Sequence, residues 1–272
     1  MGRLDGRVAF ITGAGRGLGR SHAVRLASEG ADVIAVDLCA DITSLGYPMA
    51  SGDDLLETER LVREQGRRIV ARHADVRDSA GLRAAVQAGL DELGRVDIVV
   101  ANAGISGLGA PEPDPELAFL EAVDINLSGT YRTVEAALPA MIEAGRGGSI
   151  VLTSSTAGLK GAIGGTGGTL GYVAGKHGLV GLMRSYATSL APHCIRVNTI
   201  HPTAVNTLMA TNDGVVRFAE QNPSIGEAMA NLLPVGLLEP SNISDAVLWL
   251  VSDEARYVTG VALPVDAGAA AR

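Results

Sequence analysis

The chain has 272 residues, of which 47% are hydrophobic and 19% charged, and its formal net charge is −8. This acidic balance argues against a nucleic-acid or anionic-membrane partner and favours a small molecule. Cys39 and Cys194 are too far apart for a disulfide framework or a metal site, and no run of 18 apolar residues could cross a membrane.

Seven short β-branched runs alternate with helical patterns along the chain. In order, the expected strands are residues 8–11, 32–36, 69–71, 96–101, 149–152, 195–200 and 261–265. Between them, residues 17–28 form a helical pattern, Ser79 is the expected N-cap of another, and Ser244–Asp245 precedes a third. Such alternation builds βαβ units with parallel strands. We therefore predict an α/β fold, a Rossmann-type doubly wound parallel seven-stranded sheet with helices on both faces, in a single domain over residues 1–272.

Two segments interrupt this alternation. An insert at about residues 39–52 follows the second expected strand, contains Pro48 and is longer than an ordinary strand-to-helix connection. Residues 158–171 are rich in glycine, with six glycines from Gly161 to Gly171. Glycine-rich backbone can approach a ligand closely or move aside for one. Each segment is therefore either part of a site or a solvated excursion.

The first expected strand ends in a glycine-rich turn that opens a helix, Thr12–Gly19. Gly13 allows the tight turn, Gly17 lets backbone N–H groups approach a pyrophosphate, and Gly19 permits close helix packing. Asp37 ends the second strand, where a carboxylate accepts hydrogen bonds from ribose hydroxyls and repels a 2′-phosphate. Arg16 is a counter-signal, because a basic residue there can accompany NADP. We infer an NAD site, with Asp37 outweighing Arg16.

Two short motifs at the ends of later strands extend this predicted site. Asp75 follows the third strand and could accept a hydrogen bond from the adenine amino group, with the Val76 backbone beside it. Asn102-Ala103-Gly104 follows the fourth strand, at the carboxyl edge where ligands bind in open α/β sheets. Small residues there leave room for a cofactor.

Tyr172 and Lys176 are four residues apart, so on a helix their side chains share one face. A phenol ordinarily ionises near pH ~10, and a neighbouring cation favours the phenolate. This spacing can therefore make a tyrosine a general acid/base. The alternative is an ordinary amphipathic helix, and Tyr-x-x-x-Lys alone does not decide between the two.

The motifs together resemble those of the single-domain short-chain dehydrogenase/reductase family. They occur in this order: Thr12-Gly13-(x)3-Gly17-x-Gly19, Asp75-Val76, Asn102-Ala103-Gly104, Asn126, Ser154-Ser155, Tyr172-(x)3-Lys176 and Arg196-Val197-Asn198. The resemblance implies four catalytic residues: Tyr172 as acid/base, Lys176 lowering its pKa and binding the nicotinamide ribose, Ser155 holding the substrate oxygen, and Asn126, on a helix, holding a relay water. It implies no metal.

The serine departs from the family's spacing, because the family's active serine precedes the tyrosine by about thirteen residues. Here that position is Leu159, whereas Ser155 precedes Tyr172 by 17 residues, so the glycine-rich segment is about four residues longer. Ser154 is the competing assignment, and Ser155 is preferred. His177 and His201 are possible bases, but packed or solvated histidines are the favoured interpretation.

The resemblance also implies that the turn after the sixth strand holds the nicotinamide carboxamide through the Val205 backbone and the Thr207 hydroxyl. The residues expected to contact the cofactor are Gly13, Arg16, Gly17, Leu18, Gly19, Asp37, Leu38, Asp75, Val76, Asn102, Ala103, Gly104, Tyr172, Lys176, Val205 and Thr207.

A finer resemblance is to the carveol dehydrogenase-like, mycofactocin-coupled group, carried by residues 21–27, 36–39 with the insert, 69–72 and 154–160. It implies oxidation of a terpene-type secondary alcohol by tightly retained NAD, with electrons passed on to a mycofactocin-type acceptor. The insert would then lie over the adenine end and slow NAD release.

We expect the substrate lid at about residues 203–234, and its apolar residues favour a small hydrophobic alcohol or ketone. The expected apolar wall is formed by Leu208, Met209, Val215, Val216, Phe218 and Met229. The resemblance implies a homotetramer with interfaces at the helix that carries Tyr172 and at the C-terminal strand. The first residues lack the apolar stretch of a signal peptide, so we expect a cytoplasmic protein. Two alternatives remain: an NADP-preferring 3-oxoacyl or other ketone reductase, and a non-catalytic NAD-binding regulatory protein.

Overall fold

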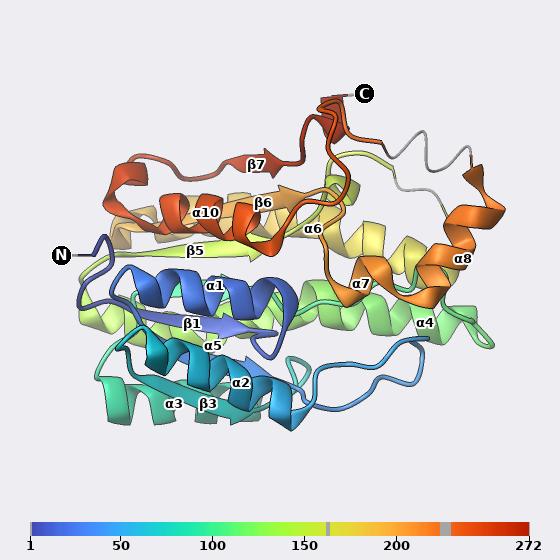
Figure 1. Cartoon of the computed structure of the whole chain (residues 1–272). Coiled ribbons are helices and arrows are strands. Elements are labelled where there is room, and N and C mark those ends of the chain that lie inside the picture. The colour runs from blue at the N-terminus through green and yellow to red at the C-terminus, as the bar shows by residue number, and fades with distance from the viewer. Residues whose placement is uncertain (1, 162–163, 224–229, 272) are drawn as a thin grey trace.

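The computed structural model describes residues 2–161, 164–223 and 230–271. Figure 1 shows one sheet between two layers of helices. The strands are β1 Val8–Thr12, β2 Asp32–Asp37, β3 Ile69–His73, β4 Ile98–Ala101, β5 Gly148–Thr153, β6 Ile195–Pro202 and β7 Ala262–Val265. All neighbours pair in parallel, in the order β3-β2-β1-β4-β5-β6-β7. The predicted doubly wound seven-stranded sheet is confirmed.

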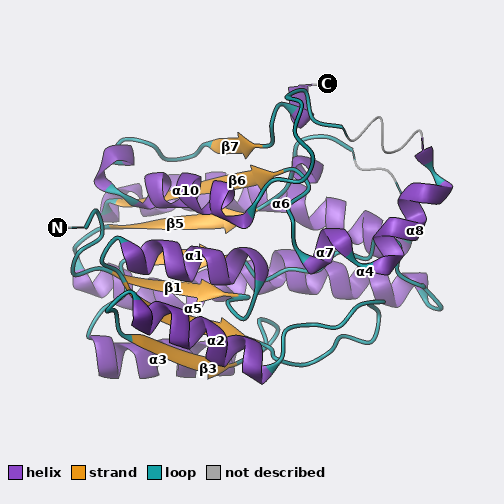
Figure 2. Cartoon of the chain, viewed as in Figure 1, coloured by secondary structure: helices purple, strands orange, loops and turns teal. Residues whose placement is uncertain are grey.

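Most helices cover one of the two faces of the sheet, and Figure 2 colours all the described helices purple and the strands orange. They are α1 Gly17–Ser28, α2 Gly52–Glu64, α3 Ser79–Leu93, α4 Pro115–Val123, α5 Gly129–Ala144, α6 Gly167–Leu190, α7 Leu208–Thr211, α8 Asp213–Gln221 and α10 Pro240–Val251. Along β1, Phe10 packs with residues of α3, α5 and α6, whereas Ile11 packs with residues of α1, α2 and α10. Alternate strand residues therefore face opposite helix layers, as a sheet buried on both faces requires.

Two predicted helix starts are displaced. Asp78, not Ser79, is the N-cap of α3, because its carboxylate accepts from the Ala80 amide at 2.9 Å. Helix α10 begins at Pro240, ahead of Ser244-Asp245, because Glu239 and Asn242 form a reciprocal capping box and proline suits the first helical position.

The glycine-rich segment is not one long loop, because its second half forms the start of α6. The amides of Gly167 and Gly168 donate to the Glu112 carboxylate at 2.8 and 2.9 Å, which satisfies two of the free donors at this helix end. A Cβ on Gly171 would lie 2.5 Å from the Phe119 carbonyl oxygen of α4. These glycines therefore let α6 approach α4, whereas the sequence favoured an approach to a ligand.

The insert ends where α2 begins at Gly52 and reaches further than the adenine end of the predicted site. Ser44 donates to the Glu121 carboxylate on α4, and a Cβ on Gly46 would lie 3.1 Å from Pro111 Cδ. In Figure 1 the chain between β2 and α2 runs out toward α4 before it returns. The insert thus extends from β2 to the loop that follows β4.

The expected lid carries α7 and α8, which lie together at one end of the molecule in Figure 1. Val216 is 47% exposed and does not line the cavity, so its expected place in the apolar wall is wrong. Met229, also expected in that wall, lies outside the described residues.

Candidate active site

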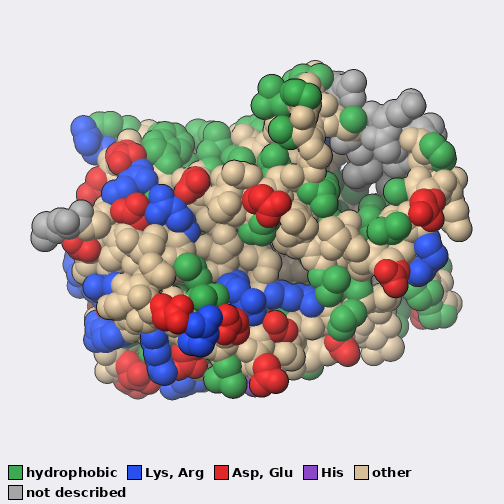
Figure 3. Space-filling view, viewed as in Figure 1, with side chains coloured by type: hydrophobic (Ala, Val, Ile, Leu, Met, Phe, Trp, Pro, Cys, Tyr) green, Lys and Arg blue, Asp and Glu red, His purple; other side chains and the backbone are tan. Residues whose placement is uncertain are grey.

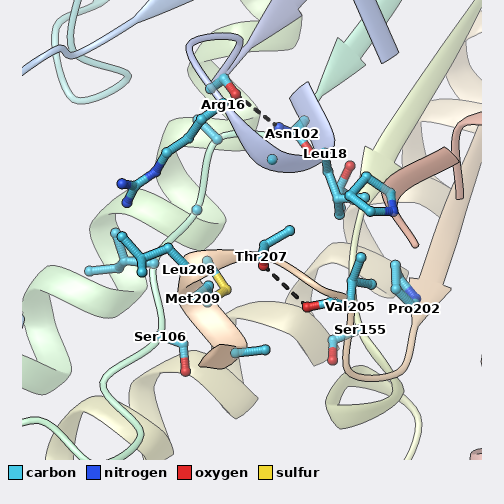
Figure 4. Close-up of a pocket in the computed structure, with 18 of the residues that line it drawn as sticks. Arg16, Leu18, Asn102, Ser106, Ser155, Pro202, Val205, Thr207, Leu208 and Met209 are labelled. Carbon is cyan, nitrogen blue, oxygen red and sulfur yellow. Dashed lines mark hydrogen bonds between the residues drawn. The ribbon is translucent and has the colours of Figure 1, made fainter. Parts of the chain in front are cut away.

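A cavity of about 1370 Å³ opens at the carboxyl ends of the strands, where β1 and β4 meet and the strand order reverses. This switch point is where open α/β sheets bind ligands. Pockets for drug-sized ligands measure roughly 300–1,000 Å³, so this larger cavity has room for a dinucleotide together with a substrate. Figure 4 shows Arg16 and Leu18 of the glycine-rich loop at one end and Ser155 and Ser106 at the other.

The glycine-rich loop fits closely under the strand ends. A Cβ on Gly13 would lie 2.8 Å from Ala103 Cα, and a Cβ on Gly19 would lie 1.9 Å from the Gly13 carbonyl oxygen. Gly17 has φ +56°, a conformation that favours glycine. Helix α1 starts without a side-chain cap and without an acidic residue in its first turn. Its N-terminus is therefore suited to an anionic group such as a pyrophosphate.

Asp37 lies beside this loop, as predicted. Its carboxylate accepts from the Gly15 amide at 2.8 Å and from the Cys39 amide at 3.2 Å. The Arg16 guanidinium donates to the Pro48 carbonyl of the insert at 2.7 Å. Arg16, the basic residue that can accompany NADP, is thus hydrogen-bonded to the insert, and both Arg16 and Asp37 line the cavity.

Asp75 and Val76 line the cavity on the same side of the sheet. The Asp75 carboxylate is held by Arg77, with an Nη2–Oδ2 distance of 2.6 Å, and Arg77 also reaches Glu121 at 3.0 Å. Burial alone would raise the pKa of Asp75, but hydrogen bonds from Arg77 hold it below its ordinary value. A charged carboxylate here can accept a hydrogen bond from an amino group.

Asn102 supports the glycine-rich loop. Its side-chain amide donates to the Thr12 carbonyl at 3.1 Å, and its backbone amide donates to the Thr12 hydroxyl at 3.2 Å. Ala103 and Gly104 line the cavity beside it. A Cβ on Gly104 would lie 2.7 Å from Asn126 Oδ1 and 3.3 Å from Lys176 Nζ, so only glycine fits there without displacing these side chains.

Asn126 is fully buried in a five-residue π-helical segment, Asp124–Ser128, that joins α4 to α5. Its side-chain amide donates to the carbonyls of Ile105 and Ala122 at 3.0 and 2.9 Å, and its Oδ1 accepts from the Ile105 amide at 3.2 Å. The side chain thus joins this segment to the loop after β4. A π-helical turn often marks a functional site.

Tyr172 and Lys176 line the cavity from α6, Lys176 buried and Tyr172 partly buried, with Lys176 Nζ 5.5 Å from the Tyr172 ring centroid. Lys176 donates to the Thr153 carbonyl at 2.7 Å, and burial lowers its pKa to about 8. Burial raises the pKa of Tyr172, and a hydrogen bond with Ser155 offsets this only in part. Lys176 makes no resolved contribution to the pKa of Tyr172 in this structure, and its amine donates to the Thr153 carbonyl.

The two serine candidates have different surroundings. The Ser154 hydroxyl is buried and donates to the Lys176 carbonyl at 2.8 Å. The Ser155 hydroxyl accepts from the Ala157 amide at 3.1 Å and interacts with the Tyr172 hydroxyl. Ser154 therefore packs the catalytic helix against β5, and Ser155 is the serine beside the tyrosine.

The histidines have other partners. His201 is fully buried between the Ser155 carbonyl and the Thr199 hydroxyl, both at 2.8 Å, and burial lowers its pKa. His177 contacts the Val173 carbonyl of its own helix at 3.0 Å and is exposed. His201 thus supports the backbone of Ser155, and neither ring lines the cavity.

The turn after β6 faces the other side of the cavity. Thr207 donates to the Val205 carbonyl at 3.3 Å, the contact drawn in Figure 4, and a Cβ on Gly17 would lie 3.3 Å from Thr207 Cγ2. This turn therefore lies against the glycine-rich loop. The apolar wall that follows it consists of Leu208, Met209, Val215 and Phe218.

Sequence reasoning missed several cavity residues. Tyr47 and Met49 come from the insert, and Ser106 and Leu108 from the loop after β4. Neither segment has a periodic pattern that would indicate which side chains face inward. The insert's length and the position of both segments at strand ends were the only signals.

Lysine is rare in this chain, which contains only Lys160 and Lys176. Both line the cavity, and Lys160 donates to the Ala269 carbonyl near the C-terminus. The remaining residues in the combined count of lysine and arginine are all arginines.

A glycine-rich loop that opens a helix and a tyrosine–lysine pair on one face of another helix share one cavity at the switch point of a doubly wound sheet. Together they define a dinucleotide-dependent oxidoreductase. The family model described as enoyl-(acyl carrier protein) reductase matches residues 13–270. The chain belongs to the short-chain dehydrogenase/reductase family, and its carveol dehydrogenase homologues cover nearly its full length.

Three relatives illustrate the similarity. An uncharacterised oxidoreductase from Mycobacterium tuberculosis is 54% identical over 266 residues, which cover 97% of this chain and 96% of the relative. A (−)-trans-carveol dehydrogenase from Rhodococcus erythropolis is 48% identical over 277 residues, covering 98% and 99%. The crystal structure of carveol dehydrogenase from Mycobacterium avium in complex with NAD has a TM-score of 0.93 and 48% identity, and covers both chains completely.

The surface adds a further observation. On the face in Figure 3, acidic and basic side chains intermingle over α1, α2 and α10.

Across residues 2–161, 164–223 and 230–271, no helix is long and apolar enough to cross a membrane. Over the same described residues, there is no cluster of three His, Cys, Asp or Glu side chains that could hold a metal ion.

Proposed function

We propose that the protein is an NAD-dependent dehydrogenase that transfers a hydride between NAD and a hydrophobic secondary alcohol or ketone. One observation carries the proposal: Tyr172, Lys176 and Ser155 line the same cavity as the glycine-rich loop and Asp37. The cavity therefore joins a dinucleotide-binding end to an end with an acid/base group. NAD, when bound, supplies the hydride chemistry.

In this proposal the protein's own residues transfer the proton and position the substrate oxygen. Tyr172 exchanges it with the substrate oxygen, and the Ser155 hydroxyl holds that oxygen in place. Lys176 binds the nicotinamide ribose, and Asn126 keeps the π-helical segment in position for a relay water. Because burial raises the pKa of Tyr172, alcohol oxidation should accelerate as the pH rises toward the pKa of the phenol, since oxidation requires the phenolate.

The residues fit NAD better than NADP. Gly13, Gly17 and Gly19 form a cradle that side chains would fill, and the Asp37 carboxylate lies beside it. A negative charge at this place favours ribose hydroxyls and opposes a 2′-phosphate. The remaining contacts expected from the sequence, including Leu18 and Leu38, line the same cavity.

The apolar wall of α7 and α8 supports a terpene-type alcohol as substrate, as does the similarity to a (−)-trans-carveol dehydrogenase. The insert connects β2 with the loop after β4, a position from which it can hold NAD tightly. Because retained NADH cannot leave to be reoxidised, its electrons would pass to a mycofactocin-type acceptor. A protein purified without added nucleotide should then contain NAD. Absence of NAD, together with full turnover on free NAD, would contradict retention.

We also propose a cytoplasmic homotetramer of single-domain chains. Neither Cys39 nor Cys194 is in a disulfide, which suits a reducing compartment. Leu170 on α6 is 52% exposed and Val261 before β7 is 38% exposed, so both expected interfaces carry exposed apolar side chains. Sedimentation velocity measurements would test the assembly.

The decisive experiment is a panel of secondary alcohols assayed with NAD and with an artificial electron acceptor. Oxidation of hydrophobic cyclic alcohols, with little activity on short polar ones, is the expected result. Tyr172→Phe should reduce turnover by at least about a thousandfold while NAD still binds, because only the proton-transfer group is lost. Activity retained in that variant would contradict the mechanism, and loss of NAD binding would show that the substitution damaged the site.

A further inference from the structure

The insert carries an aromatic side chain, Tyr47, that has no part in the mechanism above. Tyr47 is 7% exposed, and its hydroxyl has no hydrogen-bond partner of normal geometry among the residues that the structure describes. Native proteins avoid leaving buried hydroxyl groups unpaired, because the lost hydration is not replaced. The Ser106 amide approaches the phenol oxygen, but the hydroxyl has no acceptor for its own hydrogen among the described residues, which indicates an acceptor that binds in the cavity.

Tyr47 is fixed between two walls of that cavity. The next residue, Pro48, accepts from the Arg16 guanidinium at 2.7 Å, and the preceding residue, Gly46, lies against Pro111. Tyr47 lines the same cavity as Ser106, Arg16 and Tyr172. The insert thus contributes Tyr47 to the cavity that also holds the glycine-rich loop and the catalytic helix.

The surroundings favour an anionic partner. Burial raises the pKa of Tyr47. The Ser106 amide and the Arg16 charge lower this pKa only in part, so the phenol keeps its proton at neutral pH and can donate a hydrogen bond. The Arg16 charge acts on the phenol, and α1 presents an uncapped N-terminus without acidic residues to the same cavity. A donor, a cation and a helix N-terminus together suit phosphate oxygens. Tyr172 also interacts electrostatically with Tyr47, which places the phenol toward the catalytic end.

We propose that the Tyr47 hydroxyl donates a hydrogen bond to the pyrophosphate of bound NAD, at the phosphate on the nicotinamide side. The insert then contributes a binding group to the cofactor and does more than cover it. This inference rests on the proposed function, since it takes NAD as the occupant of the cavity.

Tyr47→Phe tests the proposal, because it removes the hydroxyl and keeps the ring. Isothermal titration calorimetry on nucleotide-free protein would give dissociation constants for NAD, ADP-ribose and AMP. ADP-ribose contains both phosphates, whereas AMP contains only the adenine-side phosphate. We expect about tenfold or greater weakening for NAD and ADP-ribose, and an unchanged affinity for AMP. The melting temperature of the nucleotide-free variant should be nearly unchanged, because the hydroxyl has no hydrogen-bond partner of normal geometry within the described residues.

The matched control is Tyr257→Phe, whose ring is 89% exposed and should leave every value unchanged. Unchanged NAD affinity in Tyr47→Phe would overturn the inference. So would an effect confined to the KM of the alcohol, which would place the hydroxyl against the substrate. Equal weakening for AMP with a lower melting temperature would assign a structural role and also overturn it. A wild-type protein that binds no NAD would overturn the proposed function and this inference together.

Discussion

Replacing Lys176 with methionine should change how the stability of the nucleotide-free protein depends on pH. Burial lowers the pKa of Lys176 from 10.5 to about 8 in the folded chain. Below pH 8 the amine is protonated in both states, and the folded state bears the full cost of a buried charge. Between about 8 and 10.5 the unfolded chain keeps the proton while the folded chain releases it. The stability of the wild type therefore rises with pH in this window.

The magnitude follows from the shift. One pKa unit corresponds to about 1.4 kcal/mol, so a lowering of about 2.5 units places the whole effect at about 3 kcal/mol. From pH 7 to pH 9.5 only about 1.5 units are traversed, which gives about 2 kcal/mol. Lys176→Met has no titrating amine, and its unbranched side chain fits a similar volume.

Urea unfolding monitored by far-UV circular dichroism at pH 7 and pH 9.5 would measure this difference. The wild type should gain about 2 kcal/mol relative to Lys176→Met between the two pH values. Lys160→Met is the matched control, because it removes the chain's other lysine, which is partly exposed. Parallel changes in the wild type and Lys176→Met, or a relative loss by the wild type, would refute the reasoning.

Two further substitutions test the helix contact and the cofactor preference. Gly171→Ala places a Cβ 2.5 Å from the Phe119 carbonyl oxygen and should destabilise the protein by about 1–3 kcal/mol in urea unfolding. Gly181→Ala, on the same helix with open space around the added Cβ, should be neutral or stabilising. Asp37→Asn removes the charge that opposes a 2′-phosphate and should raise the NADP-to-NAD ratio of kcat/KM by about tenfold or more.

Two outcomes would count against these expectations. If Gly171→Ala is as stable as Gly181→Ala, then α4 and α6 do not approach each other as closely as described. If Asp37→Asn leaves the ratio of kcat/KM unchanged, then the carboxylate does not face the adenosine ribose. Asp41→Asn, in the insert, removes a nearby charge that accepts from the Met49 amide and controls for overall charge.

Much of the fold could be predicted because its signals are local. The β-branched runs and the helical patterns each repeat within a few residues, so the strands, α1 and a parallel sheet could be predicted from their alternation, whereas the strand order is known only from the structure. The start of α6 could not, because the glycines that permit it are explained by Glu112 and Pro115, which lie about fifty residues away in the sequence. A glycine-rich run looks the same whether it faces a ligand or another helix.

The candidate site could likewise be predicted only in part from the sequence. The glycine-rich loop, Asp37 and the tyrosine–lysine pair were recognisable from spacing, and the structure brings them to one cavity. Spacing could not separate Ser154 from Ser155, because that choice depends on which hydroxyl meets the backbone of α6. The pKa of Tyr172 also depends on burial, which no four-residue spacing encodes.

The scarcity of lysine has a practical consequence for handling this protein. Lys176 is 4% exposed, so side-chain amine chemistry would be directed to Lys160, on the wall of the cavity. Coupling through lysine would therefore attach a sensor surface or dye at the wall of the cavity. Cys194 is exposed just before β6, at the opposite end of the strands. Burial raises the pKa of Cys39 to about 11, so a thiol reagent at neutral pH would select Cys194 and leave the cavity facing solution.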